Sequence, residues 1–307
     1  MTDITAADVK VLRDRTGAGM MDCKKAMIAC QGNIEDAIDW LRKKGLSAAA
    51  QKAGRVAAEG VIGICVQGKV GAMVEVNAET DFVARNELFQ KYVNNVVEIA
   101  NSCDCNIEQL KKHDYPGTQR SVEEELTNLI AVVGENIGIR RLERLSVDNG
   151  VVVSYVHNKI ATNLGRIGIL VALESSGDSE KLLDLGKKLA MHIAAANPLS
   201  ISTEDLDPAV LERERAVVSE QARNMGKPPE FIEKIVEGRI RKFYEDVVLL
   251  EQVFVIDGSV KVRELIANVS GEIESPIQVT KFAKFVLGEG IEKHMTDFAS
   301  EVAAQLG

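Results

Sequence analysis

A repeated order of segments constrains the fold of this 307-residue chain more strongly than any other feature. Two strand-like runs joined by a turn, then a junction and a helix-like run, occur at residues 60–100 and again at 150–197. Short runs rich in Val and Ile between turn residues are typical of antiparallel β-hairpins. The order therefore predicts an α+β fold with a duplicated core, in which each half contains antiparallel sheet.

Three helical segments at 1–45, 203–252 and 291–307 lie outside this repeated pattern. Residues 1–45 predict three short helices, the last of which ends at Gly45. Residues 203–252 predict two long charged helices around a Gly-Lys-Pro-Pro turn, typical of a helical hairpin or coiled coil. A last helix is predicted over 291–307, where Phe298 lies on the apolar stripe. The hairpin is expected as an arm inserted into the second half of the core.

The same patterns predict where the parts begin and end. A helix at 121–136 and a strand at 137–147 complete the first half, and a strand at 280–290 returns to the second. The predicted parts are a three-helix module (1–45), a linker that is helical in part (46–57), the first half of the core (58–140), the second half (141–202), the inserted arm (203–252), the return to the second half (253–290) and the C-terminal helix (291–307).

Charge and apolar content exclude several kinds of partner. The formal net charge of −9 disfavours binding to nucleic acid, which selects basic surfaces. No segment approaches the ~20 apolar residues of a membrane span, and the N-terminus has no apolar signal segment. Five cysteines at irregular spacing fit a reducing compartment better than a disulfide framework. We therefore expect a cytoplasmic protein that binds neither nucleic acid nor membrane.

The chain lacks the sequence motifs of the common enzyme classes. It has no G-x-x-x-x-G-K-[ST] phosphate loop, no G-x-S-x-G elbow and no H-E-x-x-H pair. Cys103 and Cys105 with His113 have donor atoms for a metal, but their spacing matches no standard zinc pattern. A polar loop with free thiols is the favoured interpretation. We expect no catalytic residue, no cofactor and no metal site, and hence no enzyme.

Phe82 occupies an unusual position, in the sequence ETDFVA at 79–84 between the second strand and the helix of the first half. The corresponding junction of the second half, LESSGDSEK at 173–181, has no bulky aromatic residue. Packing at this corner therefore does not require one, and we predict that Phe82 is displayed to a partner. The alternative is that Phe82 buries its ~150–250 Å² in its own core.

Three other positions are weaker candidates for a binding surface. Met20 and Met21 begin the second helix beside Arg13, and flexible methionines suit either a core or an interface. His157 closes a strand at a hairpin turn, and the loop that follows it, 158–166, is expected to be long. Gly134 ends a helix, or allows the backbone to approach another segment closely.

Several segments, in order and from end to end, resemble the bacterial elongation factor Ts family. The segments are RTGAGMMDCKKA (15–26), GNIEDAIDWLRKKG (32–45), VNAETDFVARN (76–86), GENI (134–137), MHIAAANP (191–198), EGRIRKFYEDVVLLEQVFV (237–255) and LGEGIEK (287–293). Each one alone is a weak signal, but the ordered combination is specific. The resemblance implies a ubiquitin-associated-like three-helix module, a two-part α+β core, a coiled-coil arm and a C-terminal helix.

The resemblance also implies a function. A member of this family is a guanine nucleotide exchange factor for the translational GTPase elongation factor Tu, which it binds in GDP-bound and nucleotide-free states. The segment that enters the GTPase, moves a helix and disturbs the Mg²⁺ site matches four residues here: Thr80, Asp81, Phe82 and Val83. A different class stays open, namely a scaffold or holdase that binds through the three-helix module and the coiled coil.

Secondary contacts with the partner follow from the same resemblance. Those with the GTPase domain match Arg13, Met20 and Met21, and His157 matches the histidine that touches the partner's other domains. The resemblance adds Val133 and Gly134 to the partner-binding residues. One-to-one and two-to-two assembly both stay open, as does the role of the arm.

Overall fold

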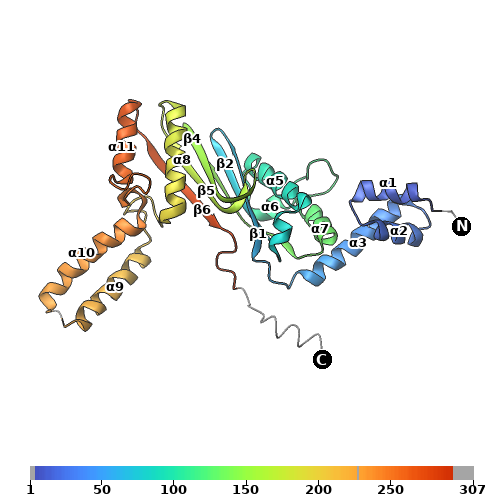
Figure 1. Ribbon diagram of the computed structural model, residues 1–307, viewed down its shortest axis with the longest axis horizontal. Coiled ribbons are helices and arrows are strands. Elements are labelled where there is room, and N and C mark those ends of the chain that lie inside the picture. The colour runs from blue at the N-terminus through green and yellow to red at the C-terminus, as the bar shows by residue number, and fades with distance from the viewer. Residues whose placement is uncertain (1–3, 227, 293–307) are drawn as a thin grey trace.

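The computed structural model describes residues 4–226 and 228–292 and shows a mixed α+β protein (Figure 1). The helices are α1 (Ala6–Thr16), α2 (Met20–Ala29), α3 (Ile34–Lys52), α4 (Asp81–Ala84), α5 (Glu87–Ser102), α6 (Ile107–Leu110), α7 (Val122–Val133), α8 (Ser179–Ala196), α9 (Pro208–Asn224), α10 (Pro229–Val247), the 3₁₀ helix η1 (Leu249–Glu251) and α11 (Val262–Glu272). The strands are β1 (Glu59–Gln67), β2 (Val70–Ala78), β3 (Ile137–Ser146), β4 (Gly150–Ala161), β5 (Leu164–Glu174) and β6 (Gln278–Val286).

The six strands form one antiparallel sheet in which the two halves of the chain stay recognisable. The first half contributes the order β3-β2-β1, and in the second half β5 lies between β4 and β6. Only two residue pairs, Ile62 with Gly165 and Gly63 with Leu164, join β1 to β5. The antiparallel pairing is confirmed, although the two halves share one sheet at this narrow junction instead of forming separate sheets.

The duplication extends beyond the hairpin and helix that the sequence predicts. In each half a hairpin is followed by a long helix, α5 or α8, that packs on the sheet. A further helix, α7 after the short α6 in the first half and α11 after the arm and η1 in the second, precedes a third strand that pairs with the second strand of the hairpin. The helix α11 is absent from the sequence prediction, which gives only the strand after it.

The two halves also pack against each other through the strand faces that are turned away from helices α5, α7 and α8. Ile62 and Met73 of the first half share a buried cluster with Leu170 of the second half. A Cβ at Gly168 would lie 2.5 Å from the Met73 sulfur, and one at Gly71 would lie 2.7 Å from a Val152 methyl. Real Cβ atoms do not approach this closely, so the glycines permit the contact between the halves. Both faces of the central strands are therefore buried.

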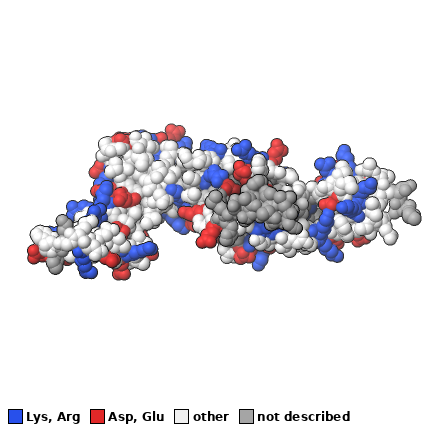
Figure 2. Space-filling model, turned by 60° about the horizontal axis from the view of Figure 1, so that its bottom comes forward, with Lys and Arg blue, Asp and Glu red and all other residues white. Residues whose placement is uncertain are grey.

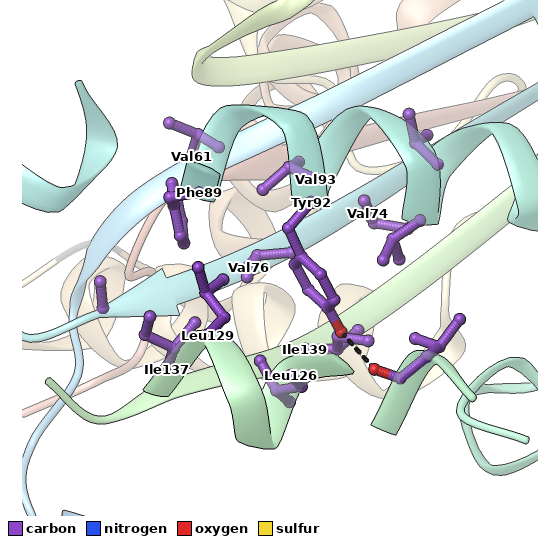
Figure 3. Packing of buried hydrophobic residues seen from close by; sticks show 14 of the residues in the cluster. Val61, Val74, Val76, Phe89, Tyr92, Val93, Leu126, Leu129, Ile137 and Ile139 are labelled. Atoms are coloured by element: carbon purple, nitrogen blue, oxygen red, sulfur yellow. Dashed lines mark hydrogen bonds between the residues drawn. The ribbon is translucent and has the colours of Figure 1, made fainter. Parts of the chain in front are cut away.

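The core of the first half lies between β1, β2 and β3 on one side and α5 and α7 on the other (Figure 3). Phe89 and Tyr92 of α5 are fully buried there, against Val76 and Leu129. The Tyr92 hydroxyl donates to the Val122 carbonyl oxygen at 3.1 Å, so its polar end is satisfied inside the core. This packing makes a rigid base for the junction between β2 and α5.

The three-helix module sits at the N-terminal end of the molecule, and its third helix reaches the core (Figure 1). The prediction that this helix ends at Gly45 is wrong, because α3 continues to Lys52. Gly45 is buried against α7, where its Cβ would lie 3.5 Å from that of Ala131, and Arg42 forms an ion pair with Glu124. Packing against α7 thus overrides the weak helix preference of glycine.

The inserted arm is a helical hairpin, as predicted, and projects from the second half (Figure 1). Its helices α9 and α10 share a small apolar cluster that includes Val218, Val236 and Ile240. Asp207 caps α9 by accepting from the backbone N–H of Ala209 at 2.9 Å. The C-terminal helix predicted at 291–307, with Phe298, lies outside the described residues except for 291 and 292, which are not helical.

Every helix in the described part of the chain is too short or too polar to cross a lipid bilayer.

Candidate functional site

The junction between β2 and α5 divides its side chains between solvent and core. Strand β2 ends at Ala78, the single turn α4 covers Asp81–Ala84, and α5 begins at Glu87. The side chain of Phe82 is 80% exposed, whereas Val83 is 5% exposed and packs in the core of the first half. The exposed position agrees with the prediction that Phe82 is displayed, and not with the alternative that it lies in its own core.

Two reciprocal contacts hold this turn against the loop after α7. The Glu135 carboxylate accepts from the backbone N–H of Thr80 at 3.0 Å and from its hydroxyl at 2.7 Å. In the opposite direction, Glu79 accepts from the backbone N–H of Asn136 at 2.5 Å. Hydrogen bonds to ionised carboxylates are stronger than neutral ones, so these contacts fix the start of the turn.

The far end of the turn is fixed as well. The backbone N–H of Arg85 donates to the carbonyl of Phe82 at 3.1 Å, and that of Asn86 donates to the carbonyl of Val83 at 2.9 Å. The Asn86 side chain then caps α5 by accepting from the N–H of Leu88 at 2.9 Å. The backbone that carries Phe82 is therefore ordered before any partner binds, which lowers the entropy cost of association.

Val133 and Gly134 belong to the same corner. Val133 is half-buried, and Gly134 ends α7 in the left-handed conformation at φ +89°, with its N–H donating to Ile130. That turn directs the following residue, Glu135, towards Thr80. The structure thus brings segment 79–84 together with segment 133–136, which the sequence analysis treats as separate candidates. The sequence prediction missed the roles of Glu79, Glu135 and Asn136, although they lie in segments 76–86 and 134–137, which carry the family resemblance.

Met20, Met21 and Arg13 form an exposed surface on the three-helix module. Met20 and Met21 are 46% and 65% exposed, and Arg13 is exposed as well. The buried cluster of the module contains a different methionine, Met27, packed with Leu12. The interpretation of Met20 and Met21 as core residues is therefore wrong. No contact among the described residues joins this surface to the Phe82 turn.

His157 does not close a strand, contrary to the prediction. It lies inside β4, paired with Ile167 of β5, and β4 continues to Ala161. The pairing persists through a register shift near Lys159, so the long loop expected after His157 is an extended hairpin with a short turn. The imidazole is exposed, and its Nδ1 lies 3.0 Å from the Tyr155 hydroxyl.

Cys103 and Cys105 are joined in a disulfide, so the prediction of free thiols is wrong for this pair. Helix α5 ends at Ser102, and the turn that follows places the two Cα atoms 5.4 Å apart. Cysteines separated by one residue give no disulfide signal in a sequence, because the bond depends on this local turn. Cys23, Cys30 and Cys65 are free.

Basic and acidic side chains are interspersed over the face shown in Figure 2. Blue and red groups alternate along the described parts of the helical module, the core and the arm on this face. A continuous basic surface, which is typical of nucleic-acid binding, is not seen on the described part of this face. The fold and the site together define a class of α+β protein that displays an aromatic side chain on a fixed turn.

Comparison with known proteins identifies the family. The family model described as "Elongation factor TS" matches residues 79–289, more than half of the chain. The chain is 56% identical over 307 residues to elongation factor Ts of Rhodospirillum centenum, covering 100% of both chains. It is also 56% identical over 307 residues to that of Paramagnetospirillum magneticum, covering 100% of this chain and 98% of the relative. The chain belongs to the elongation factor Ts family, as its resemblance predicts, and this membership supports a role in translation elongation.

Proposed function

We propose that this chain is a guanine nucleotide exchange factor for the GTPase elongation factor Tu, acting in the cytoplasm. Family membership supports the exchange role, and the observation that carries the mechanism is the exposed Phe82 on its fixed turn. Asp81 and Phe82 project from the turn, whereas Thr80 and Val83 hold it in place. We assign insertion into the GTPase to the first pair and positioning to the second.

The chemistry of the GTPase explains why one inserted ring suffices. A GTPase holds GDP through phosphate contacts and a Mg²⁺ ion that requires near-octahedral geometry. Packed helices tolerate little added volume, so a ring driven between them shifts the groups that hold the ion. Burial of Phe82 supplies ~1.5–3 kcal/mol towards that displacement. No bond is made or broken, and the chain lowers the affinity for GDP only through differential binding.

Thermodynamic linkage then determines when the factor dissociates from the GTPase. If the chain weakens GDP binding by some factor, GDP weakens binding of the chain by the same factor. The chain therefore binds GDP-bound elongation factor Tu, stabilises the nucleotide-free form, and dissociates when a nucleotide enters. The remaining surfaces supply affinity for both states: Arg13, Met20, Met21, Val133, Gly134 and His157. Assembly as one-to-one or two-to-two complexes is compatible with this cycle.

The deciding experiment measures the release of fluorescent GDP from elongation factor Tu by stopped flow. We expect the wild-type chain to accelerate release and Phe82→Ala to lose most of this effect, about 10- to 150-fold for ~1.5–3 kcal/mol. Phe231→Ala is the matched control, because Phe231 is a 51% exposed phenylalanine in the arm. Circular dichroism verifies that all three proteins are equally folded.

The outcomes separate the exchange factor from a scaffold or holdase. A scaffold would bind elongation factor Tu without changing the rate of GDP release, and Phe82→Ala would then alter binding at most. If the wild type has no effect on release, the exchange role is refuted. If Phe82→Ala accelerates release as well as the wild type does, the role stands but insertion of Phe82 is not its mechanism.

A further inference from the structure

Three side chains with sulfur or imidazole donor atoms meet just after the end of α5. None of them is among the proposed partner-binding residues. The sulfur atoms of Cys103 and Cys105 and a ring nitrogen of His113 all lie within 4.8 Å of one another. They are the only group of three or more Cys, His, Asp or Glu donors close enough together to hold a metal ion among residues 4–226 and 228–292. His113 is eight residues from Cys105, so the fold and not a sequence motif brings them together.

Local structure fixes both parts of this cluster. Cys103 caps the C-terminal end of α5, and its N–H donates to the carbonyl of Ile99 at 3.0 Å. Asn106 follows Cys105 directly and caps α6 through a capping box with Gln109, so a single residue separates Cys105 from that helix. The carbonyl of His113 accepts from the N–H of Val122 at 2.9 Å, which ties the histidine to the start of α7. The donors are therefore held by backbone that is already ordered.

The environment allows a cation to enter. The two cysteines are half-buried and pack against the core of the first half, whereas His113 is exposed. Nearby Asp104 is exposed and pairs with Arg144 at 3.7 Å, so its carboxylate is engaged by a strand residue. One side of the cluster thus faces apolar packing and the other faces solvent, which leaves a coordination position for water.

We propose that the reduced form of this cluster binds Zn²⁺ through Cys103, Cys105 and His113, with water as the fourth ligand. Zinc takes tetrahedral sets of thiolate and imidazole ligands at ~2.3 Å and ~2.0–2.1 Å, respectively. Such a set places the two sulfurs ~3.8 Å apart, farther than the ~2.05 Å of a disulfide bond. The disulfide and the zinc-bound form therefore exclude each other.

The conversion between the two forms balances in electrons and protons. A dithiol reductant supplies two electrons and two protons, breaks the Cys103–Cys105 bond and becomes a disulfide itself. Zn²⁺ then displaces one proton from each thiol and binds the two thiolates together with neutral His113. Reduction and zinc binding would thus replace the bond between the two cysteine sulfurs with coordination of both sulfurs to one Zn²⁺ ion. This inference does not depend on the proposed exchange function.

The test is a metal titration of the full chain after treatment with a dithiol reductant and its removal under anaerobic conditions. Zn²⁺ is added in competition with a chromophoric chelator, and Co²⁺ is used in parallel because thiolate ligands give it a charge-transfer absorption. We expect one equivalent of tightly bound metal and the charge-transfer band. In Cys103→Ser and Cys105→Ser, binding weakens at least ~10-fold, as it does in His113→Ala.

Controls use residues of the same types elsewhere in the chain. Cys65→Ser removes a free cysteine and His157→Ala an exposed histidine, and neither is expected to change metal binding. The oxidised wild type is expected to bind no metal at this site. The proposal is overturned if the reduced wild type binds no metal, if its Co²⁺ form lacks the thiolate band, or if Cys103→Ser binds as tightly as the wild type. The Co²⁺ spectrum of the wild type decides the matter even if a variant fails to fold.

Discussion

Thr80 donates both its backbone N–H and its hydroxyl to one carboxylate, that of Glu135, which follows it by 55 residues. The bond lengths are 3.0 Å and 2.7 Å. Glu79 accepts from the N–H of Asn136 in return. The orientation of Phe82 is therefore set by a loop that belongs to the end of α7, and not by the local sequence around the phenylalanine alone.

The first prediction concerns this contact. Glu135→Ala leaves the N–H and hydroxyl of Thr80 without their acceptor, so the turn must be ordered on binding. Ordering one such segment costs about 0.5–1.5 kcal/mol, which corresponds to a loss of about 2- to 10-fold in stimulated GDP release. Glu135→Gln keeps an acceptor oxygen, so its stimulated rate of GDP release is expected to lie between those of the wild type and Glu135→Ala. Stopped-flow release of fluorescent GDP measures the effect.

The control for Glu135→Ala is Glu123→Ala, which removes an exposed carboxylate from the first turn of α7, the helix that precedes Glu135. Thermal unfolding separates positioning from general damage. We expect Glu135→Ala to slow exchange while the unfolding temperature changes little. If exchange is as fast as in the wild type, Glu135 does not position Phe82.

A second prediction concerns Gly45, the buried glycine inside α3. A Cβ there would lie 3.5 Å from that of Ala131, an ordinary van der Waals contact. Gly45→Ala should therefore raise the free energy of unfolding by about 0.5–1 kcal/mol, because alanine is favoured over glycine within a helix. Gly45→Leu should lower it, since the larger side chain forces α3 away from α7. Urea unfolding compares the variants, and a destabilised Gly45→Ala would show that this contact is too tight for a methyl group.

Local periodicity and repetition were sufficient to predict much of this fold. The two hairpin-and-helix units and the helical arm follow from nearby residues, and the exposed position of Phe82 follows from comparison of the two repeated units. The continuation of α3 through Gly45 could not be predicted in this way, because it depends on contact with α7. Likewise, the strand position of His157 depends on pairing with β5.

The same reasoning explains what was missed at the site. The partners of the Phe82 turn lie more than 50 residues away in the sequence, and a single chain gives no signal for such a contact. The helix α11 was missed as well, although its 11 residues equal the length of α1, which the sequence predicts. The functional roles of the site residues stay predictions until exchange is measured.

A third prediction concerns acid stability through Glu75, a fully buried carboxylate in β2. It accepts from Arg140 at 3.1 Å and from the N–H of Gly288 at 2.8 Å, and it also pairs with Arg141. Burial acts to raise the pKa of Glu75, but the hydrogen bonds from Gly288, Asn77 and Arg141 outweigh it and hold the pKa below the ordinary 4.5. The contribution of Glu75 is thus fully present above 4.5 and is lost as the pH falls through the lowered pKa.

Glu75→Gln tests this contribution. The variant removes the buried carboxylate that pairs with Arg140 and Arg141, although Arg141 keeps its ion pair with Glu289. We therefore expect the free energy of unfolding at neutral pH to fall by about 3 kcal/mol. Between about pH 6 and about pH 3 the wild type should lose more stability than the variant. Urea unfolding measures the free energy of unfolding at neutral pH and its change over this pH range, with Glu123→Gln as the exposed control. Parallel pH profiles for wild type and Glu75→Gln would contradict the assignment.

The last prediction concerns His192, a fully buried histidine in α8. Its Nε2 lies 2.9 Å from Gln252 Oε1, and its Nδ1 accepts from the N–H of Val255 at 3.3 Å. Both contacts suit a neutral ring with its proton on Nε2, and a second proton on Nδ1 would face the N–H of Val255. Burial lowers the pKa of His192 below the ordinary 6.5, although the hydrogen bond to Gln252 acts to raise it.

The direction of this shift determines its effect on stability. Below pH 6.5 the unfolded chain takes up a proton on this residue while the folded chain does not, so folding becomes less favourable as the pH falls. The loss reaches at most about 1.4 kcal/mol per pH unit and ends at the folded pKa. His192→Gln cannot take up the proton, and its unfolding free energy should therefore change less between about pH 7 and about pH 5 than that of the wild type. Equal slopes in this range would show that the buried ring binds its proton as readily as the unfolded chain does.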